Sequence, residues 1–173
     1  VVDLKTLSYT YENRSVSQLY GIPEGDYIGF PVGTNLEDDQ KHRLLEIITD
    51  ELEHDSERDP KRSRLIELRE MNQKHGDVVW TENHASFVRD AQGKPTAILT
   101  ITRDITDRKK KEEGLRKSAE EISDLYDNAP CGYHSLDPGG TFLRMNNTEL
   151  RWLGYARDEI IGKKKFNDLL TSE

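Results

Sequence analysis

The sequence predicts an α+β fold, and three features of the 173-residue chain support this prediction. Two short segments rich in β-branched and aromatic residues come first, and three longer segments of this kind, joined by tight turns, follow later. Segments in which apolar residues recur at helical spacing lie between these groups. A pattern from the first part of the chain then recurs near its end. We therefore expect one complete α+β unit, a linking helix and the start of a second unit.

The first strands are expected at residues 1–4 and 7–11, on either side of a short turn. Asn13 can cap the helix that follows them, and Gly21 can end it. A longer helix is expected within residues 35–55. Its buried side is formed by apolar residues at helical spacing, namely Leu44, Leu45, Ile47, Ile48 and Leu52.

Three further strands are expected at residues 64–71, 78–88 and 96–102. The turns His75–Asp77 and Asp90–Gly93 connect them. Because consecutive strands joined by tight turns pair with one another, these segments predict an antiparallel meander.

The last strand runs directly into a charged helix, and the sequence changes from a period of two to a helical period at Asp104–Asp107. Thr106 can cap this helix, and the Asp107 carboxylate is favoured in its first turn by the helix dipole. An apolar stripe follows at spacings of four, three and four residues, formed by Leu115, Ala119, Ile122 and Tyr126. A strand that feeds a helix in this way can pass strain in the sheet to whatever follows.

The motif Asn-x5-Leu-Tyr-Gly-x6-Ile-Gly at residues 13–29 recurs as Asn-x5-Trp-Leu-Gly-x6-Ile-Gly at residues 146–162. This internal duplication implies two related units, of which the second stops before its last three strands. We assign residues 1–106 to the first unit, residues 107–127 to a charged amphipathic helix and residues 128–173 to the incomplete second unit.

Composition restricts the function. A net charge of −8 argues against a nucleic-acid surface, because phosphate binding needs clustered Lys and Arg. No apolar run approaches the length of a membrane span, and no signal peptide is visible. The single cysteine, Cys131, excludes an internal disulfide and fits a reducing, cytoplasmic compartment. The chain does not begin with Met, and we expect a fragment of a longer protein that could carry a membrane anchor elsewhere.

Several segments resemble the PAS sensory fold and occur in the order of that family. In the first unit they are Leu19–Gly21, Ile28–Gly29, Trp80–Glu82, Phe87–Gly93 and Asp104–Lys109. Residues 128–137 and 153–163 resemble the opening half of a second PAS domain. The resemblance implies a five-stranded antiparallel sheet with small helices on one face, enclosing a cavity.

PAS domains act in bacterial signalling proteins, most often upstream of a histidine kinase and often upstream of a diguanylate cyclase. The resemblance therefore implies a non-enzymatic sensory and relay module, in a two-component sensor histidine kinase. It also implies that Asp104, Ile105 and Thr106 relay the signal mechanically. We expect a homodimer formed through the apolar stripe of the charged helix, with a rigid spacer as the alternative reading of that helix. The alternative functions are the PAS region of a diguanylate cyclase or phosphodiesterase, and a ligand-free dimerisation scaffold.

No catalytic or metal-binding residues are expected. Nucleophilic catalysis needs a Ser or Cys within reach of a His. Cys131 and His134 are three residues apart near a strand, so their side chains point to opposite faces. The five His residues show no metal-ligand spacing with Cys or with one another.

The sequence does not identify a cofactor. Photoactive flavin-binding relatives carry a reactive Cys after the Ile28–Gly29 turn, where this chain has none, and this excludes cysteinyl-flavin chemistry. Haem-binding relatives use a His on the long helix, but His42 and His54 lie among charged residues and are expected to face water, which argues against haem. A non-covalent small ligand and a core filled by its own side chains are the two readings left. The candidate residues lining a ligand cavity are Tyr11, Ile48, Ile66, Leu68 and Asn83.

Overall fold

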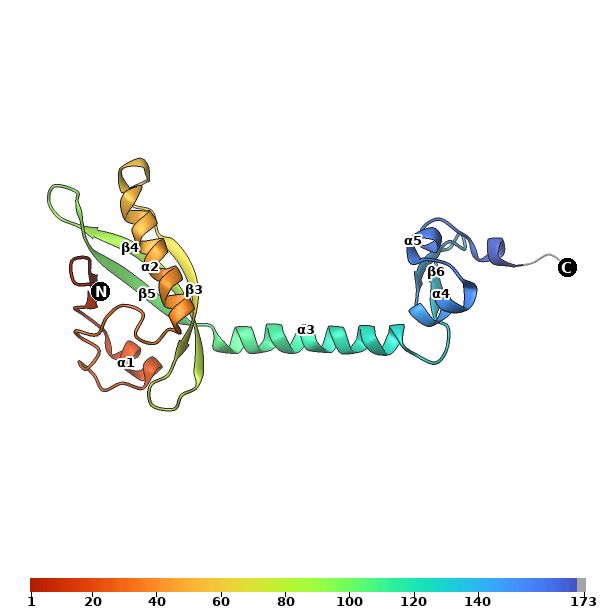
Figure 1. Cartoon of the computed structure of the whole chain (residues 1–173), viewed down its shortest axis with the longest axis horizontal. Helices are drawn as coiled ribbons and strands as arrows, with labels where there is room; N and C mark the ends of the chain where they lie inside the picture. The colour runs from red at the N-terminus through yellow and green to blue at the C-terminus, as the bar shows by residue number, and fades with distance from the viewer. Residues whose placement is uncertain (171–173) are drawn as a thin grey trace. The chain divides into compact units, whose positions relative to one another are not determined.

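The computed structural model describes residues 1–170 of the chain. It divides into a first unit, Val1–Lys110, and a second unit that begins at Lys111. The first unit contains a five-stranded antiparallel sheet with its helices on one face (Figure 1), as the sequence predicts. None of the described helices combines the length and the hydropathy that a membrane span needs.

The sheet of the first unit consists of β1 (Val2–Asp3), β2 (Ser8–Tyr9), β3 (Arg64–Met71), β4 (Val78–Arg89) and β5 (Pro95–Asp104). Its strand order is β2-β1-β5-β4-β3, so the long strand β4 pairs with β5 on one edge and with β3 on the other. Asn83 of β4 lies opposite both Ile66 of β3 and Thr102 of β5. Because directly opposed residues share a face of the sheet, these three side chains point to the same side.

The core of the first unit lies between the sheet and α2 (Asp38–Glu53), which is followed by the short 3-10 helix η1 (Asp55–Glu57). Its buried residues are Val2, Val32, Ile48 and Ile98, and Leu44 and Leu45 pack against them. The prediction that Leu52 is buried is wrong: it is 37% exposed, because it lies in the last turn of α2, one residue before the helix ends.

Helix α1 (Arg14–Tyr20) begins and ends at the residues that the sequence predicts. Asn13 Oδ1 accepts a hydrogen bond from Val16 N at 3.2 Å. Gly21 ends the helix with φ of 68°, in the left-handed region that favours glycine. A Cβ at Gly21 would also come within 2.6 Å of Asn72 Oδ1, so close packing requires glycine at this position as well.

Helix α3 (Thr106–Asp127) follows β5 directly, and none of its side chains is fully buried. The second unit then forms β6 (His134–Leu136), β7 (Phe142–Met145), α4 (Asn147–Leu153), α5 (Arg157–Ile160) and the 3-10 helix η2 (Phe166–Leu169). The buried core of this unit consists of Phe142, Met145, Leu150 and Ile160. The described residues of the second unit thus have a core of their own.

The internal duplication is visible in the two folds. Helices α1 and α4 have seven residues each, and both begin after a capping asparagine. Gly29 N donates to Tyr9 O at 2.8 Å in the first unit, and Gly162 N donates to Phe142 O at 2.8 Å in the second. A constant offset of 133 residues (162 − 29) therefore relates equivalent positions in the two units.

Truncating the buried core of the first unit should destabilise it. Ile98→Ala removes a side chain that is only 7% exposed, and such substitutions typically lower the free energy of unfolding by about 2–5 kcal/mol. The measurement is urea unfolding followed by Trp80 fluorescence, in a Trp152→Phe background that leaves Trp80 as the only tryptophan.

The matched control is Ile101→Ala on the same strand. Ile101 is 67% exposed, so its truncation should change the free energy of unfolding by no more than about 0.5 kcal/mol. Equal destabilisation by the two substitutions would contradict the assignment of Ile98 to the core.

Candidate ligand cavity and strand–helix junction

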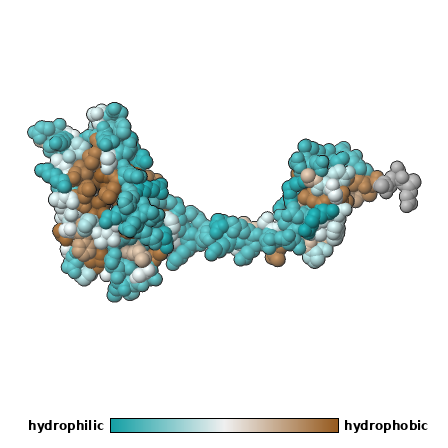
Figure 2. Space-filling model, in the orientation of Figure 1, coloured by the Kyte–Doolittle hydropathy of each residue, from teal (hydrophilic) through white to brown (hydrophobic). Residues whose placement is uncertain are grey.

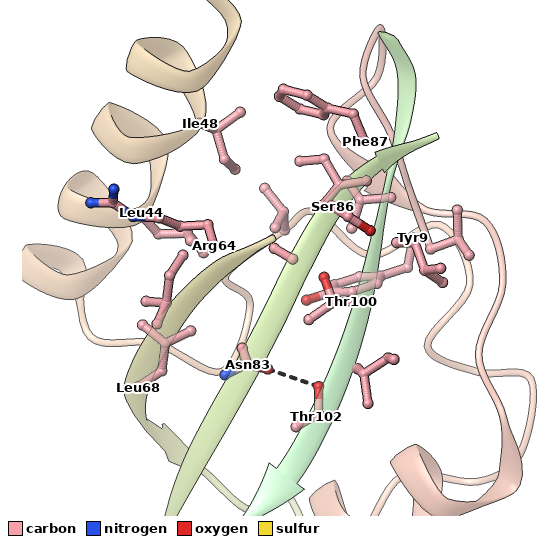
Figure 3. Close-up of a pocket in the computed structure, with 18 of the residues that line it drawn as sticks. Tyr9, Leu44, Ile48, Arg64, Leu68, Asn83, Ser86, Phe87, Thr100 and Thr102 are labelled. Atoms are coloured by element: carbon pink, nitrogen blue, oxygen red, sulfur yellow. Dashed lines mark hydrogen bonds between the residues drawn. The ribbon is translucent and has the colours of Figure 1, made fainter. Parts of the chain in front are cut away.

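A cavity of about 480 Å³ lies between α2, the sheet and the N-terminal segment of the first unit. Figure 3 shows Leu44 and Ile48 entering from α2, Leu68 from β3, and Thr100 and Thr102 from β5. Apolar side chains gather on this face of the unit between α2 and strands β4 and β5 (Figure 2). The volume and the apolar walls are typical of a small-molecule site.

The five residues predicted from the sequence to line a cavity all border this one: Tyr11, Ile48, Ile66, Leu68 and Asn83. Tyr11 is 61% exposed and lies at the rim, whereas Ile48 and Asn83 are buried. Contact between these residues and a ligand stays a prediction.

A chain of polar side chains crosses the floor of the cavity. Thr102 Oγ1 donates to Asn83 Oδ1 at 2.8 Å, a bond drawn in Figure 3, and Asn83 Nδ2 donates to Thr81 Oγ1 at 2.8 Å. Thr81 Oγ1 donates to Glu70 Oε2 at 2.5 Å, and Tyr20 OH donates to the same oxygen at 2.7 Å. Every donor in this chain thus points towards the Glu70 carboxylate.

Glu70 is only 5% exposed, and burial raises the pKa of its carboxyl group, while the bonds from Thr81 and Tyr20 partly oppose this rise. Three tyrosines surround this end of the cavity. The ring centroids of Tyr9 and Tyr27 are 4.4 Å apart, and those of Tyr20 and Tyr27 are 5.6 Å apart. Burial, followed by the charge of Glu70, raises the pKa of Tyr9 to about 12. These hydroxyls are therefore neutral near pH 7.

Arginines surround an acidic side chain at the other end of the cavity. The Glu51 carboxylate lies 3.1 Å from Arg58, 2.5 Å from Arg62 and 3.6 Å from Arg64. Arg64 and Glu70 are both on β3 and six residues apart, which is about 20 Å along a strand. The cavity therefore has an arginine-rich end, apolar walls and a distant end that holds a buried carboxylate.

The predicted relay residues form a junction that is bonded to β4. Ile105 is buried, and its N–H donates to Trp80 O at 2.8 Å. Trp80 N in turn donates to Thr106 Oγ1 at 3.0 Å, and Thr106 N donates to Asp104 Oδ1 at 2.8 Å. The prediction that Thr106 caps the helix is wrong: Thr106 is the first residue of α3, its hydroxyl accepts the Trp80 N–H, and its own N–H is bonded to the Asp104 carboxylate. A relay role for the three residues stays a prediction.

The first turn of α3 is held against the outer face of the sheet. Arg108 lies 2.7 Å from Glu67 and 3.4 Å from Glu82, and Lys109 lies 2.6 Å from Glu67. The Lys109 ammonium also sits 5.4 Å from the centre of the Trp80 ring. Lys109 and then Arg108 lower the pKa of Glu67 through hydrogen bonds. The start of the helix is thus coupled to β3 and β4 by charge as well as by backbone bonds.

Beyond this turn α3 is exposed. Leu115 and Ile122 are 74% and 67% exposed, and Ala119 is also exposed. Tyr126 differs from them, because its ring lies 6.0 Å from that of Tyr133 and its carbonyl accepts a bond from Asn146 Nδ2 at 2.9 Å. Three of the four residues of the predicted stripe are therefore open to solvent, and the fourth packs within the second unit.

The histidines lie apart from the cavity. Neither His42 nor His54 is among the described residues that line it, and each ring nitrogen Nδ1 faces a carbonyl oxygen one turn earlier in α2. His134 Nδ1 lies 2.7 Å from Glu149 Oε1, and Cys131 is exposed. Within residues 1–170, no group of three or more His, Cys, Asp or Glu side chains is arranged to hold a metal ion.

The polar end of the cavity was not predicted, although one signal for it is present in the sequence. Glu70 follows Ile66 and Leu68 at intervals of two residues, so strand alternation places its carboxylate on the inward face. An acidic residue at an inward position needs partners. Those partners, Tyr20 and Thr81, come from other elements, and no local pattern identifies them.

Comparison with protein families gives two matches. The family described as the PAS fold matches residues 5–110, and the family described as the PAS domain matches residues 130–173. A sequence comparison with curated proteins gives no match.

Solved structures resemble the chain at low identity. A sensory box histidine kinase/response regulator from Burkholderia thailandensis is 24% identical, with a TM-score of 0.54 over 72% of this chain and 88% of that one. The N-terminal domain of a diguanylate cyclase with a PAS/PAC sensor, from Marinobacter aquaeolei, is 18% identical, with a TM-score of 0.50 over 62% and 93%. The light-oxygen-voltage protein of Rhodobacter sphaeroides is 18% identical, with a TM-score of 0.51 over 72% and 67%. These likenesses concern the fold. The match to residues 5–110 alone covers more than half of the chain, which therefore belongs to the PAS family.

Proposed function

We propose that the first unit senses a small molecule in its cavity and passes the change through β4 to the junction Asp104–Thr106, and so to α3. The observation that carries this proposal is that the polar floor of the cavity and the junction share neighbouring residues of β4. Thr81 bonds to Glu70 and lies opposite Asp104, while Trp80 holds Ile105 and Thr106.

A ligand that alters the hydrogen bonds of Asn83 or Thr81 would shift the part of β4 next to Trp80, and Trp80 is the residue of β4 that bonds to the start of α3. An element can transmit such a signal only if the ligand binds its two arrangements with different affinity. The backbone bonds of the junction support this route, because they go to Trp80, which is next to Thr81 in β4, and Thr81 bonds to Glu70 at the cavity.

We propose that the output is a histidine kinase domain elsewhere in the protein, since the Burkholderia thailandensis neighbour is a sensory box histidine kinase/response regulator. A diguanylate cyclase is the second candidate, on the same kind of support from the Marinobacter aquaeolei neighbour. We propose no catalytic step for the 173 residues themselves. The exposed stripe of α3 is proposed to pair with the same helix of a second chain.

Ligand occupancy can be measured directly. Native mass spectrometry of the purified chain is expected to show extra mass on the folded protein that is lost on denaturation. Ala85→Phe should reduce the fraction of the protein that carries this extra mass, because Ala85 lines the cavity and a larger side chain fills part of it. A wild-type protein without added mass would contradict ligand sensing and favour the scaffold alternative.

The bond between Asp104 and Thr106 provides a test of the junction. Asp104→Ala removes the acceptor of the Thr106 N–H and should weaken the first turn of α3 by about 0.5–2 kcal/mol, the range found when a side chain that bonds an N–H at a helix start is removed. Hydrogen exchange of the amides at residues 106–109 should accelerate, while exchange in β3 stays unchanged. In the full-length protein the variant should lose most of its ligand-dependent change in output.

Asp107→Ala is the matched control for this test. The substitution removes a carboxylate that interacts favourably with the helix dipole in the same turn, but it leaves the bond between Asp104 and Thr106 intact. Equal loss of regulation in both variants would count against the junction as the relay.

If α3 pairs with the same helix of a second chain, the protein is a dimer, and charged residues placed in the apolar stripe of α3 should disrupt it. The wild-type chain should have twice its chain mass of 20.0 kDa in analytical ultracentrifugation. The double variant Leu115→Asp and Ile122→Asp should be monomeric, because it buries two carboxylates in the proposed interface.

The control for this charge is Lys117→Asp. It also changes the net charge by −2, but position 117 lies about 200° around the helix from Leu115. This variant should remain dimeric. A dimer that survives in the double variant would rule out the stripe as the interface.

A further inference from the structure

The inward face of β3 carries opposite charges at its two ends. The residues on this face alternate along the strand, and all of them line the cavity: Arg64, Ile66, Leu68 and Glu70. Glu70 is buried and already accepts two hydrogen bonds. A negatively charged group in the cavity is therefore repelled at the Glu70 end and attracted at the Arg64 end, about 20 Å away.

The Arg64 end holds more arginines than the acids that pair with them. Glu51 forms ion pairs with Arg58, Arg62 and Arg64, and Asp50 forms a further pair with Arg58. In the part of the chain that the structure describes, Arg62 and Arg64 have no acidic partner besides Glu51. These five residues, which we call the arginine cluster, thus carry three positive charges and two negative ones.

Arg64 is the most weakly held arginine of the cluster. It lies 3.6 Å from Glu51 Oε1, and its five N–H donors make no hydrogen bond to any of residues 1–170. Its side chain is 45% exposed, so a ligand can reach it. Figure 3 shows it extending from the start of β3 towards α2, beside Leu44. Arg62 approaches the same Glu51 oxygen at 2.5 Å, so the nearest nitrogens of the two guanidinium groups are no more than about 6 Å apart.

Two further acids at this end of the cavity do not supply the missing acceptor. Asp55 is bonded to both terminal nitrogens of Arg89, at 2.5 Å and 2.8 Å. Asp59 forms no ion pair with the arginine cluster, and its Oδ1 accepts the Lys61 N–H at 2.9 Å. Arg89 Nε is a buried donor without a partner among the described residues, but it is closed to solvent, so we assign no ligand to it.

We propose that the cavity of the first unit binds a small amphipathic carboxylate, with its carboxylate group at Arg62 and Arg64 and its apolar chain along Ile66 and Leu68. A carboxylate has two acceptor oxygens and can bond to two guanidinium groups at once, and it brings the charge that balances the cluster. An apolar chain that runs inwards from Arg64 meets Ile66 and then Leu68, in a cavity of about 480 Å³. This assignment rests on the proposed sensory function and names the chemical class of its ligand.

The test compares three probes that share an eight-carbon chain and differ in the head group: octanoate, 1-octanol and octylamine. Their affinities are measured by isothermal titration calorimetry with the 173-residue chain near pH 7. Octanoate should bind at least about tenfold more tightly than 1-octanol, because hydrogen bonds between two charged groups are stronger than those to a hydroxyl group. Octylamine should bind no more tightly than 1-octanol, since the arginines repel its ammonium group.

Arg64→Gln removes the most weakly held guanidinium group. This variant should prefer octanoate by less than about threefold, because only Arg62 is left to bond its carboxylate. Its affinity for 1-octanol should change by less than about twofold, because the apolar contacts of the chain stay the same.

Arg69→Gln is the matched control. Arg69 is on the same strand but on its outer face, pairs with Glu37 at 3.2 Å and is not among the residues that line the cavity. The substitution changes the net charge by the same amount as Arg64→Gln, and the preference for octanoate should stay as in the wild type.

Ala85→Phe tests whether the probes bind inside the cavity. Ala85 lies opposite Arg64 in the sheet and lines the cavity, so the larger side chain should weaken the binding of octanoate and 1-octanol together. Unchanged affinity for octanoate in this variant would place its site on the protein surface and overturn the proposal.

Equal affinity of the wild type for octanoate and 1-octanol, no binding of octanoate, or tighter binding of octylamine would each overturn the carboxylate assignment. The same loss of preference in Arg64→Gln and Arg69→Gln would also overturn it. Binding of 1-octanol or octylamine in these cases would leave the sensory function in place. An empty cavity in native mass spectrometry, together with no binding of any probe, would remove both.

Discussion

Strand β4 is hydrogen-bonded along both edges, and this pairing is the constraint on which the rest of the first unit depends. Thr81 lies opposite Leu68 on one side and Asp104 on the other, and it is fully buried. A residue held in this way cannot shift without breaking the ladder on either side. Its side chain nevertheless bonds to Glu70 in the cavity floor. One position of β4 thus connects the cavity, the sheet and the start of α3.

The two units show how one backbone pattern accommodates two kinds of interior. The capping asparagine, the left-handed glycine after the helix and the backbone bond from Gly29 to Tyr9 recur in the second unit at the same offset. The side chains that these features enclose differ, with Phe142 and Met145 where the first unit has Tyr9 and Glu12. The same caps and turns thus enclose interiors of different polarity, which agrees with the general rule that function lies in sites built on a shared fold.

The elements of the fold could be predicted because their signals are local. Alternation in β3 and β4, the cap at Asn13 and the stop at Gly21 depend on neighbours in the sequence. The start of α3 shows the limit of such signals. Thr106 is of a residue type that can cap a helix, but its hydroxyl accepts the N–H of Trp80, which is 26 residues away, and α3 begins at Thr106 itself.

The same limit applies to the site. Ile66, Leu68 and Asn83 could be predicted from periodicity, because an inward-facing residue of a sheet lies on the cavity side whatever surrounds it. Glu70 could not be interpreted in this way, since the meaning of a buried carboxylate depends on which donors reach it. Its donors come from α1 and β4, which no local pattern in the sequence identifies.

The two parts of α3 are held in different ways. Its first turn is held by Glu67, Glu82 and the ring of Trp80, whereas the middle of the helix is supported by pairs along its own surface, such as Arg116 with Glu113 at 2.7 Å. Ion pairs within a helix stabilise it but do not determine its direction. The junction and the first turn are therefore the contacts that hold the start of α3 to the sheet. Trp80 takes part in both, through its backbone at the junction and through its ring at Lys109, so the proposed relay would act on both contacts together.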